Sequence, residues 1–346
     1  MSDERGQLMA AEVAEQPAAL QRLLDEGRAE VAAVAAAVRD AQPRFVLLAA
    51  RGTSDHAALY AKYLVEITLG LPAGLASPST LTAYGARPRM DGVLWLTVSQ
   101  SGGSPDLVDS TRVAAECGAL TVAVTNAPGS PLASAARLHV DTRSGPERAV
   151  AATKSYTGQL LALWLLVDAW RGGSGDAARD LPELAEQTLG SGAAAQVAPR
   201  FRFVERLVTT GRGYAYPTAR EAALKLMETS YVSAHAFSGA DLLHGPFAMI
   251  DEDRPVIVVA PGGVGGDALV PVLERLRERG ADVTLVGDPA AAPWADGWLP
   301  VAAGAPEELG PVLQILPLQQ LALRMAVARG HDPDAPRGLR KVTETW

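Results

Sequence analysis

Hydroxyl side chains gather in two short segments of the first half of the chain, and each segment follows an apolar run. The first segment holds Thr53 and Ser54, and the second holds Ser99, Gln100, Ser101 and Ser104. In an open parallel sheet such segments lie where strands end and helices begin, so the free N–H groups of helix N-termini converge there. Hydroxyls and amides suit a phosphate dianion, because each charge-assisted hydrogen bond contributes about 1.5–3 kcal/mol. The two segments therefore predict a phosphate site that needs no lysine.

The second half of the chain contains a matching turn without hydroxyls. Ala260-Pro-Gly-Gly263 stands 161 positions after the segment that begins at Ser99, and it keeps the glycine but has no serine or threonine. Ser-Gly-Gly is also ordinary loop composition, so one copy alone fits either interpretation. Because turn-forming serines should be tolerated equally in both copies, the difference favours a phosphate site in the first half.

A charged pair lies on a predicted helix of the second half. Residues 219–231 have a helical pattern, and Lys225 and Glu228 stand three apart, so they share one face. The same spacing fits a solvated ion pair that contributes only a few tenths of a kcal/mol. Taken without context, the spacing favours that surface pair.

Two further basic residues stand out. His244 is one of five histidines and precedes Gly245 and Pro246, which should fix its backbone in a turn. Lys341 belongs to a basic tail, and the apolar residues of that tail give it the means to dock on the protein.

Strands and helices alternate along the chain in two similar halves. Three apolar runs of the first half have counterparts about 161 residues later, in the same order: 45–50 with 207–211, 93–98 with 255–259, and 118–124 with 280–286. Helical patterns such as 107–117 and 268–279 lie between them, which implies parallel β-α-β units. Short and nearly continuous apolar runs fit strands that are covered on both faces. We therefore predict an α/β fold of two tandem, doubly wound, flavodoxin-like lobes.

The pattern also suggests where the segments of the chain begin and end. We predict an N-terminal helical segment (1–42), a first lobe that binds phosphate (43–171), a connector (172–200), a second lobe with the charged helix and the histidine loop (201–330), and a tail that carries Lys341 (331–346).

Composition excludes several classes of partner. The formal net charge is −8 and the isoelectric point is near 5.3, which argues against a broad nucleic-acid or anionic-membrane surface. The apolar runs 31–38 and 160–167 are far shorter than the roughly 20 residues of a membrane span. Residues 1–6 do not resemble a signal peptide, so we expect a cytoplasmic protein. A single cysteine, Cys117, permits no intrachain disulfide.

Taken in order, these strings resemble the SIS family, specifically the isomerase half of glucosamine-6-phosphate synthase and the SIS-type glucosamine-6-phosphate deaminases. The matching strings are Glu15-Gln-Pro17, Arg51-Gly-Thr-Ser54, Ser99-Gln-Ser-Gly102, Gly145-Pro-Glu147, Val150-Ala-Ala-Thr-Lys154, Gly211-Arg-Gly213, Glu221 to Glu228, His244-Gly-Pro246 and Pro336 to Thr343. Each is short, but the ordered set covers nearly the whole chain.

The resemblance implies a role for each matching residue. The 6-phosphate of a sugar would be held by Thr53, Ser99, Gln100, Ser101 and Ser104, with Ser54 beside them. Val150 would lend its backbone near the amino group, and Glu228 would move a proton between C1 and C2 with Lys225 beside it. His244 would assist ring opening, and Lys341 would lie at the open-chain carbonyl. The family places the histidine of one subunit in the other subunit's site, so a homodimer is implied.

The resemblance also favours a reaction. The synthase draws ammonia from glutamine with an N-terminal cysteine, and residues 1–42 hold none. We therefore expect a glucosamine-6-phosphate deaminase that converts glucosamine 6-phosphate and water to fructose 6-phosphate and ammonium, without metal or organic cofactor. Leu243, where synthases usually have lysine, resembles the deaminase branch. Ala152 replaces a serine of the synthase, which leaves one sugar contact open.

Three alternatives share these features. A fructosamine-6-phosphate deglycase or a galactosamine-6-phosphate deaminase would use the same turns. A phosphosugar-sensing SIS regulator would bind without turnover, but residues 1–42 are acidic on balance and show no basic helix-turn-helix face. A sensor would also have little use for Lys225, Glu228, His244 and Lys341 together.

Overall fold

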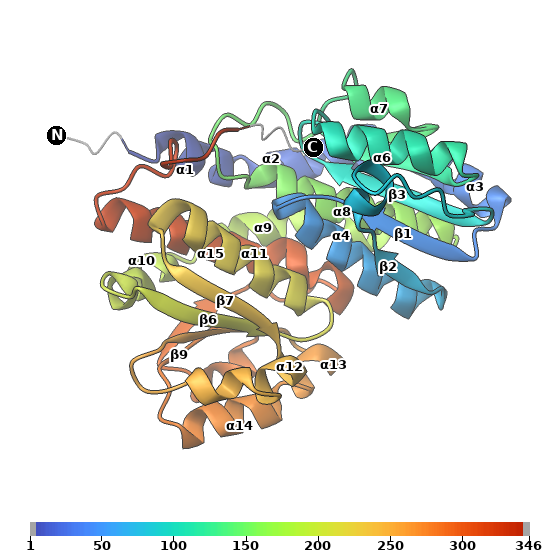
Figure 1. Cartoon of the computed structure of the whole chain (residues 1–346). Coiled ribbons are helices and arrows are strands. Elements are labelled where there is room, and N and C mark those ends of the chain that lie inside the picture. Colours follow the sequence, from blue (N-terminus) through green and yellow to red (C-terminus); the bar gives the residue numbers. More distant parts are fainter. Residues whose placement is uncertain (1–4, 342–346) are drawn as a thin grey trace. The chain divides into compact units, whose positions relative to one another are not determined.

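The computed structural model describes residues 5–341, which form two compact units. The unit that we call the first-lobe unit comprises 18–147, 154–179 and 340–341. The second-lobe unit comprises 5–17, 148–153 and 180–339. Each unit is built around one parallel sheet (Figure 1).

The sheet of the first-lobe unit has five parallel strands in the order β2-β1-β3-β4-β5. They are β1 (Phe45–Ala49), β2 (Ala73–Leu75), β3 (Val93–Ser99), β4 (Leu120–Thr125) and β5 (Leu138–Asp141). The central strands β3 and β4 are buried along almost their whole length, which explains why their sequences are apolar apart from small hydroxyl residues. The chain moves from β1 to one edge at β2 and then returns to β3, so the strand order reverses between β1 and β3.

Helices cover both faces of this sheet. They are α2 (Gln16–Arg22), α3 (Arg28–Ala41), α4 (Thr53–Leu64), α5 (Pro78–Thr82), α6 (Pro105–Glu116), α7 (Pro131–Ala135) and α8 (Lys154–Trp170). Helix α8 packs against α3 and α4, and α6 packs against α5 and α7. All but one of the 17 residues of α8 are buried, because this helix is covered by other helices as well as by the sheet.

The sheet of the second-lobe unit has the same topology, with the order β10-β9-β8-β6-β7. Its strands are β6 (Arg206–Gly211), β7 (Ser233–Ser238), β8 (Val256–Ala260), β9 (Val283–Gly287) and β10 (Gly297–Pro300). All pair in parallel. The predicted fold class of two parallel-sheet α/β lobes is confirmed, and the order reverses here between β6 and β8.

The helices of the second-lobe unit surround one long helix. They are α1 (Gln7–Ala14), α9 (Leu181–Gly190), α10 (Ala193–Val197), α11 (Ala215–Ser230), α12 (Gly239–Leu243), α13 (Val264–Asp267), α14 (Val270–Glu278) and α15 (Gly310–Ala328). Helix α15 packs against α1, α9, α10 and α11. Residues of β8, α12 and α14 form a separate apolar cluster on the other side of the sheet.

Two helices differ from the sequence pattern. The helix expected over 219–231 begins four residues earlier, at Ala215, and the pattern over 268–279 corresponds to α14 alone, with the short α13 before it. Pro271 stands in the first turn of α14, where its missing N–H is not needed. Within residues 5–341 no helix is both long and apolar enough to cross a bilayer.

Candidate functional site

The two hydroxyl segments lie next to each other at the point where the strand order of the first-lobe sheet reverses. One follows β1 and the other follows β3, and these strands pair directly, with Ala49 opposite Thr97. Since parallel strands end at the same edge, the two turns open on one side of the sheet, the usual ligand position of an open α/β sheet. The structure therefore brings together the turns that the sequence singled out.

The turn after β3 is organised by its own serines. The Ser99 hydroxyl accepts a hydrogen bond from the Gly102 N–H at 3.1 Å, and the Ser101 hydroxyl accepts one from the Gly103 N–H at 3.3 Å. Gly102 has φ of 62°, and a Cβ there would meet the Ser130 side chain. Ser104 then precedes α6 in an extended conformation, and its hydroxyl does not cap that helix, whereas Asp106 Oδ1 accepts the Leu107 N–H at 2.9 Å within the first turn. Each hydroxyl keeps its own hydrogen to donate outward.

The turn after β1 is tied to the turn after β3 through an ion pair. Arg51 donates to the buried Asp106 in the first turn of α6, with Nε and Nη2 at 3.0 and 2.7 Å from Oδ2. The guanidinium is half exposed, so it brings a positive charge to the hydroxyl turns. Sequence reasoning assigned Arg51 no role, although it begins the Arg51-Gly-Thr-Ser54 string.

Thr53 and Ser54 occupy the first turn of α4, but they face different surroundings. Thr53 is partly exposed, whereas Ser54 is buried and its hydroxyl accepts a hydrogen bond from Gln159 of α8 at 3.0 Å. Ser54 therefore anchors the turn to α8. Its contact with a substrate stays a prediction.

The carboxylate of Glu147 holds the predicted catalytic Lys341. Glu147 Oε2 lies 2.9 Å from the Lys341 ammonium and accepts a hydrogen bond from the Ser155 hydroxyl at 2.6 Å. Oε1 accepts the Ser155 N–H at 3.0 Å. The side chain of Glu147 is fully buried. In the sequence Glu147 stands out only as part of the string Gly145-Pro-Glu147, because a partner 194 positions away leaves no local signal.

A cavity of about 550 Å³ in the first-lobe unit connects these groups. Its lining comes largely from the segments after β3, β4 and β5: Arg22, Glu26, Gln100, Asn126, Asp141, Arg143, Gly145, Pro146 and Glu147. The Asn126 side chain shapes one wall by donating to the Gly145 carbonyl at 2.7 Å and accepting from the Ser144 N–H at 2.8 Å. Gln100 of the hydroxyl turn and Glu147, the partner of Lys341, thus line one cavity.

In the second-lobe unit the predicted pair on α11 is a triad. Lys225 is 1% exposed and its ammonium lies 2.5 Å from Glu228 Oε2 and 3.3 Å from Glu221 Oε1. Glu221 is fully buried, whereas Glu228 is 21% exposed. The spacing of three and four residues places all three side chains on one helix face. The interpretation as a solvated surface pair is therefore wrong for Lys225.

The two carboxylates keep Lys225 positively charged. Burial by itself would lower the pKa of Lys225, but the two carboxylates outweigh this effect and raise its pKa above the ordinary lysine value. A lysine that stays protonated cannot act as a nucleophile near neutral pH. Its ammonium instead holds Glu228 in place, and Glu228, being partly exposed, is the carboxylate of the triad that is open to a substrate.

His244 lies on a different element from this triad, at the C-terminal end of α12. It caps the C-terminus of α12 and is exposed, and Gly245 after it has φ of 112°, so the predicted turn is present. The catalytic role of His244 stays a prediction.

Val150 lies in the segment 148–153, which side chains from elsewhere in the second-lobe unit hold in place. The buried carboxylate of Glu12 accepts hydrogen bonds from the N–H groups of Arg148 and Ala149. Gln319 of α15 donates to the Thr153 carbonyl at 3.2 Å. The predicted residues thus fall into two sets, with the hydroxyl turns and Lys341 in the first-lobe unit and Val150, Lys225, Glu228 and His244 in the second.

Comparison with known proteins gives a consistent family. The family model described as "SIS domain" matches the chain twice, at residues 41–169 and 201–329. The glutamine–fructose-6-phosphate aminotransferase [isomerizing] of Methanothermobacter thermautotrophicus is 36% identical over 338 residues, which is 96% of this chain but 56% of that protein. The chain thus spans little more than half the length of this relative.

Two solved structures are similar over almost their whole length. A candidate phosphosugar isomerase from Silicibacter pomeroyi DSS-3 is 36% identical with a TM-score of 0.85, covering 94% of this chain and 99% of that one. The C-terminal domain of the glucosamine-fructose-6-phosphate aminotransferase from Francisella tularensis is 28% identical with a TM-score of 0.85, covering 97% and 99%.

Proposed function

The chain belongs to the SIS domain family, and from this premise we propose that it is a glucosamine-6-phosphate deaminase. Glucosamine 6-phosphate and water would give fructose 6-phosphate and ammonium. The observation that carries the proposal is the α11 triad, in which a buried and protonated Lys225 lies between Glu221 and the partly exposed Glu228. A sensor that only binds sugar phosphate would gain nothing from a partly exposed carboxylate held beside a buried lysine.

The hydroxyl turns are the proposed phosphate site. Ser99, Ser101 and Ser104 donate their hydroxyl hydrogens, and the N-terminus of α6, which the Ser104 hydroxyl does not cap, lies directly after them. The Arg51 guanidinium supplies positive charge beside them. This combination explains how a chain with net charge −8 can bind a dianion locally.

The proton transfer is assigned to Glu228. In the open-chain aldehyde, the carboxylate removes the proton from C2, and the electron pair of that C–H bond forms a C1–C2 double bond while O1 gains a proton. Return of a proton to C1 then gives an imine at C2. Water adds to this imine and ammonia leaves, so fructose 6-phosphate forms and no redox partner is required. A general base of this kind contributes about 10²- to 10⁴-fold in rate.

Lys341 is assigned to the developing negative charge on O1. Glu147 would set the position of its ammonium, which supports a positioning role for Glu147. The assignments of ring opening to His244 and of the amino-group contact to the Val150 backbone come from the family resemblance. The proposal includes a homodimer in which the partner subunit's His244 completes each site, and a cytoplasmic location.

A second candidate follows from the relatives. Because the chain is similar to the isomerase part of an aminotransferase that is nearly twice as long, it could form glucosamine 6-phosphate from fructose 6-phosphate and ammonia supplied by another domain or protein. Leu243, which resembles the deaminase branch, favours hydrolysis.

The test is an assay of the released amine, which is ammonium from glucosamine 6-phosphate and galactosamine 6-phosphate and free lysine from fructoselysine 6-phosphate. We expect ammonium from the first substrate, and we expect Glu228→Gln to lower kcat by about 10²- to 10⁴-fold with sugar-phosphate binding changed only a few-fold. Glu274→Gln, on the exposed face of α14, is the matched control and should behave as wild type. Absence of ammonium with glucosamine 6-phosphate and galactosamine 6-phosphate contradicts a deaminase, and near-normal release by Glu228→Gln contradicts the role of that residue.

A further inference from the structure

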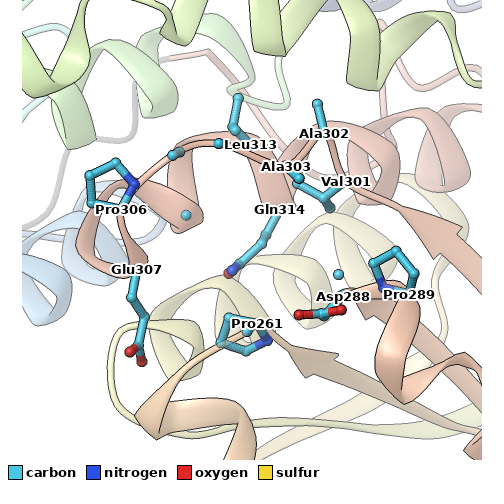
Figure 2. A pocket seen from close by; sticks show the side chains of 15 residues that line it. Pro261, Asp288, Pro289, Val301, Ala302, Ala303, Pro306, Glu307, Leu313 and Gln314 are labelled. Carbon is cyan, nitrogen blue, oxygen red and sulfur yellow. The ribbon is translucent and has the colours of Figure 1, made fainter.

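A second cavity lies at the carboxyl edge of the second-lobe sheet. Its volume is about 250 Å³, and it is lined by residues that follow β8, β9 and β10 and by the first turns of α15 (Figure 2). The side chains that point into it include Pro261, Asp288, Val301, Glu307 and Gln314 (Figure 2). This volume is just below the range of about 300–1,000 Å³ used by drug-sized ligands, so it suits a molecule with a single small ring.

Gln314 gives the cavity an unused hydrogen-bond acceptor. Its residue is 3% exposed, and within residues 5–341 its side-chain Oε1 has no hydrogen-bond partner. The amide group extends from α15 into the space between Pro261 and Asp288 (Figure 2). A buried and unsatisfied polar atom costs about 1–3 kcal/mol, and such atoms are rare in native proteins. A ligand donor in the cavity would remove this cost.

The charges around the cavity define which donor fits. The Asp288 carboxylate accepts the Ala290 N–H at 2.8 Å, and the Glu307 carboxylate accepts the N–H groups of Val264 and Gly265 at 3.0 and 2.9 Å. Each carboxylate can accept further bonds. None of the described lining residues carries a basic side chain, so a phosphate or carboxylate ligand would be repelled.

The equivalent cavity of the first-lobe unit has a lining of mixed charge. It too is lined by the segments after the third, fourth and fifth strands of its sheet, but Arg22 and Arg143 contribute to its lining beside Glu26, Asp141 and Glu147. One fold position therefore carries basic groups in one unit and only acidic and neutral groups in the other. The difference is chemical and not topological, which is what two sites with different ligands would show.

We propose that the second-lobe cavity binds a small cationic polyol, that is, a protonated amine that also carries hydroxyl groups on a single ring. The ammonium pairs with Asp288 or Glu307, and a hydroxyl or N–H of the ligand donates to Gln314 Oε1. The walls of Pro261, Val301 and Leu313 pack against the ring. This site is separate from the phosphate turns and does not depend on the proposed deaminase activity.

Calorimetric titration of the full chain with D-glucosamine tests the proposal, with D-glucose and glucose 6-phosphate as the neutral and anionic comparisons. We expect saturable binding of D-glucosamine that survives Ser99→Ala combined with Ser101→Ala. Gln314→Leu, which removes the acceptor at similar volume, should weaken binding by about three- to tenfold, the loss expected for a hydrogen bond between uncharged groups. Gln320→Leu is the matched control on the same helix, because its amide bonds the Leu189 carbonyl outside the cavity.

Asp288→Asn is a second test of the proposal. It does not depend on whether α15 tolerates a leucine at position 314, because Asp288 is partly exposed in a loop. This substitution should weaken the binding of D-glucosamine about tenfold and change the binding of D-glucose little. The proposal is overturned if wild type shows no saturable binding of D-glucosamine, if Gln314→Leu and Asp288→Asn both bind as wild type, or if the double serine variant alone abolishes binding.

Discussion

The two lobes have the same strand order but differ at the turn after the third strand of each sheet. After β3, serines form the turn, the Ser104 hydroxyl does not cap α6, and the only first-turn N–H for which a side-chain acceptor is described is that of Leu107, bonded to Asp106 of the same turn. After β8, the turn has no hydroxyl, and the Glu307 carboxylate accepts the N–H groups of Val264 and Gly265 at the start of α13. In the second lobe the protein's own carboxylate thus occupies the donors of this turn, which is why we place an external phosphate in the first lobe.

The helices that follow the first strand of each sheet differ in a related way. Helix α4 carries Lys62, whose ammonium lies 2.7 Å from Glu66, and both side chains are partly exposed. Helix α11 carries Lys225 between two carboxylates with almost no exposure. Equal spacing on a helix therefore gives an ordinary surface pair in one lobe and a buried charged triad in the other.

Replacing Lys225 should give the largest effect and test the contrast between these helices. Lys225→Met leaves the buried carboxylate of Glu221 without its cation, so we expect the free energy of unfolding in urea to fall by about 3–5 kcal/mol. Lys62→Met on α4 removes an exposed pair and should cost at most about 1 kcal/mol. Equal losses in the two variants would contradict the difference in burial.

The pH dependence gives a second measure of the same triad. The pKa of Lys225 is raised above its unfolded value by Glu221 and Glu228 against the effect of burial. Its contribution to stability is therefore complete below the unfolded pKa of about 10.4 and is lost as the pH rises above it. Wild type should lose unfolding free energy above that pH more steeply than Lys225→Met, and parallel curves would contradict this assignment.

Removing the serines of the β3 turn tests the contrast between the two turns. With two bonds of about 1.5–3 kcal/mol each, Ser99→Ala combined with Ser101→Ala should raise KM for glucosamine 6-phosphate by about 10²-fold or more, with a smaller change in kcat. Ser134→Ala removes an exposed hydroxyl of the same unit and should leave KM as in wild type. An unchanged KM in the double variant would place the phosphate elsewhere.

The smallest effect concerns Glu307 in the second lobe. Glu307→Ala removes the acceptor of two N–H groups at the start of α13, so the free energy of unfolding should fall by about 1–2 kcal/mol, as for loss of an N-terminal cap. The exposed Glu274→Ala on α14 is the control, with an expected change within about 0.5 kcal/mol. A stability equal to that of the control would show that water replaces the carboxylate at no cost.

The fold could be predicted because a strand that is buried on both faces of the sheet has a mostly apolar local sequence. Runs such as 93–98 and 255–259 are apolar except for Thr97, and they became β3 and β8 within one residue at either end. The hydroxyl turns were placed for the same reason, since parallel strands that are neighbours end at one edge of the sheet. Helix boundaries were less accurate, as at Ala215, because Pro217 in the first turn of α11 reads in the sequence as a helix break, although a first turn tolerates proline.

The sequence by itself determined which residue types follow each strand and that Lys225 and Glu228 share a helix face. Only the tertiary structure decided that Lys225 is buried, that Glu147 holds Lys341 across 194 positions, and that Glu307 reaches α13 from 42 positions away. The physical reason is that strand and helix formation depend on periodic local burial. The environment of a charge, in contrast, depends on which distant segments remove water from it.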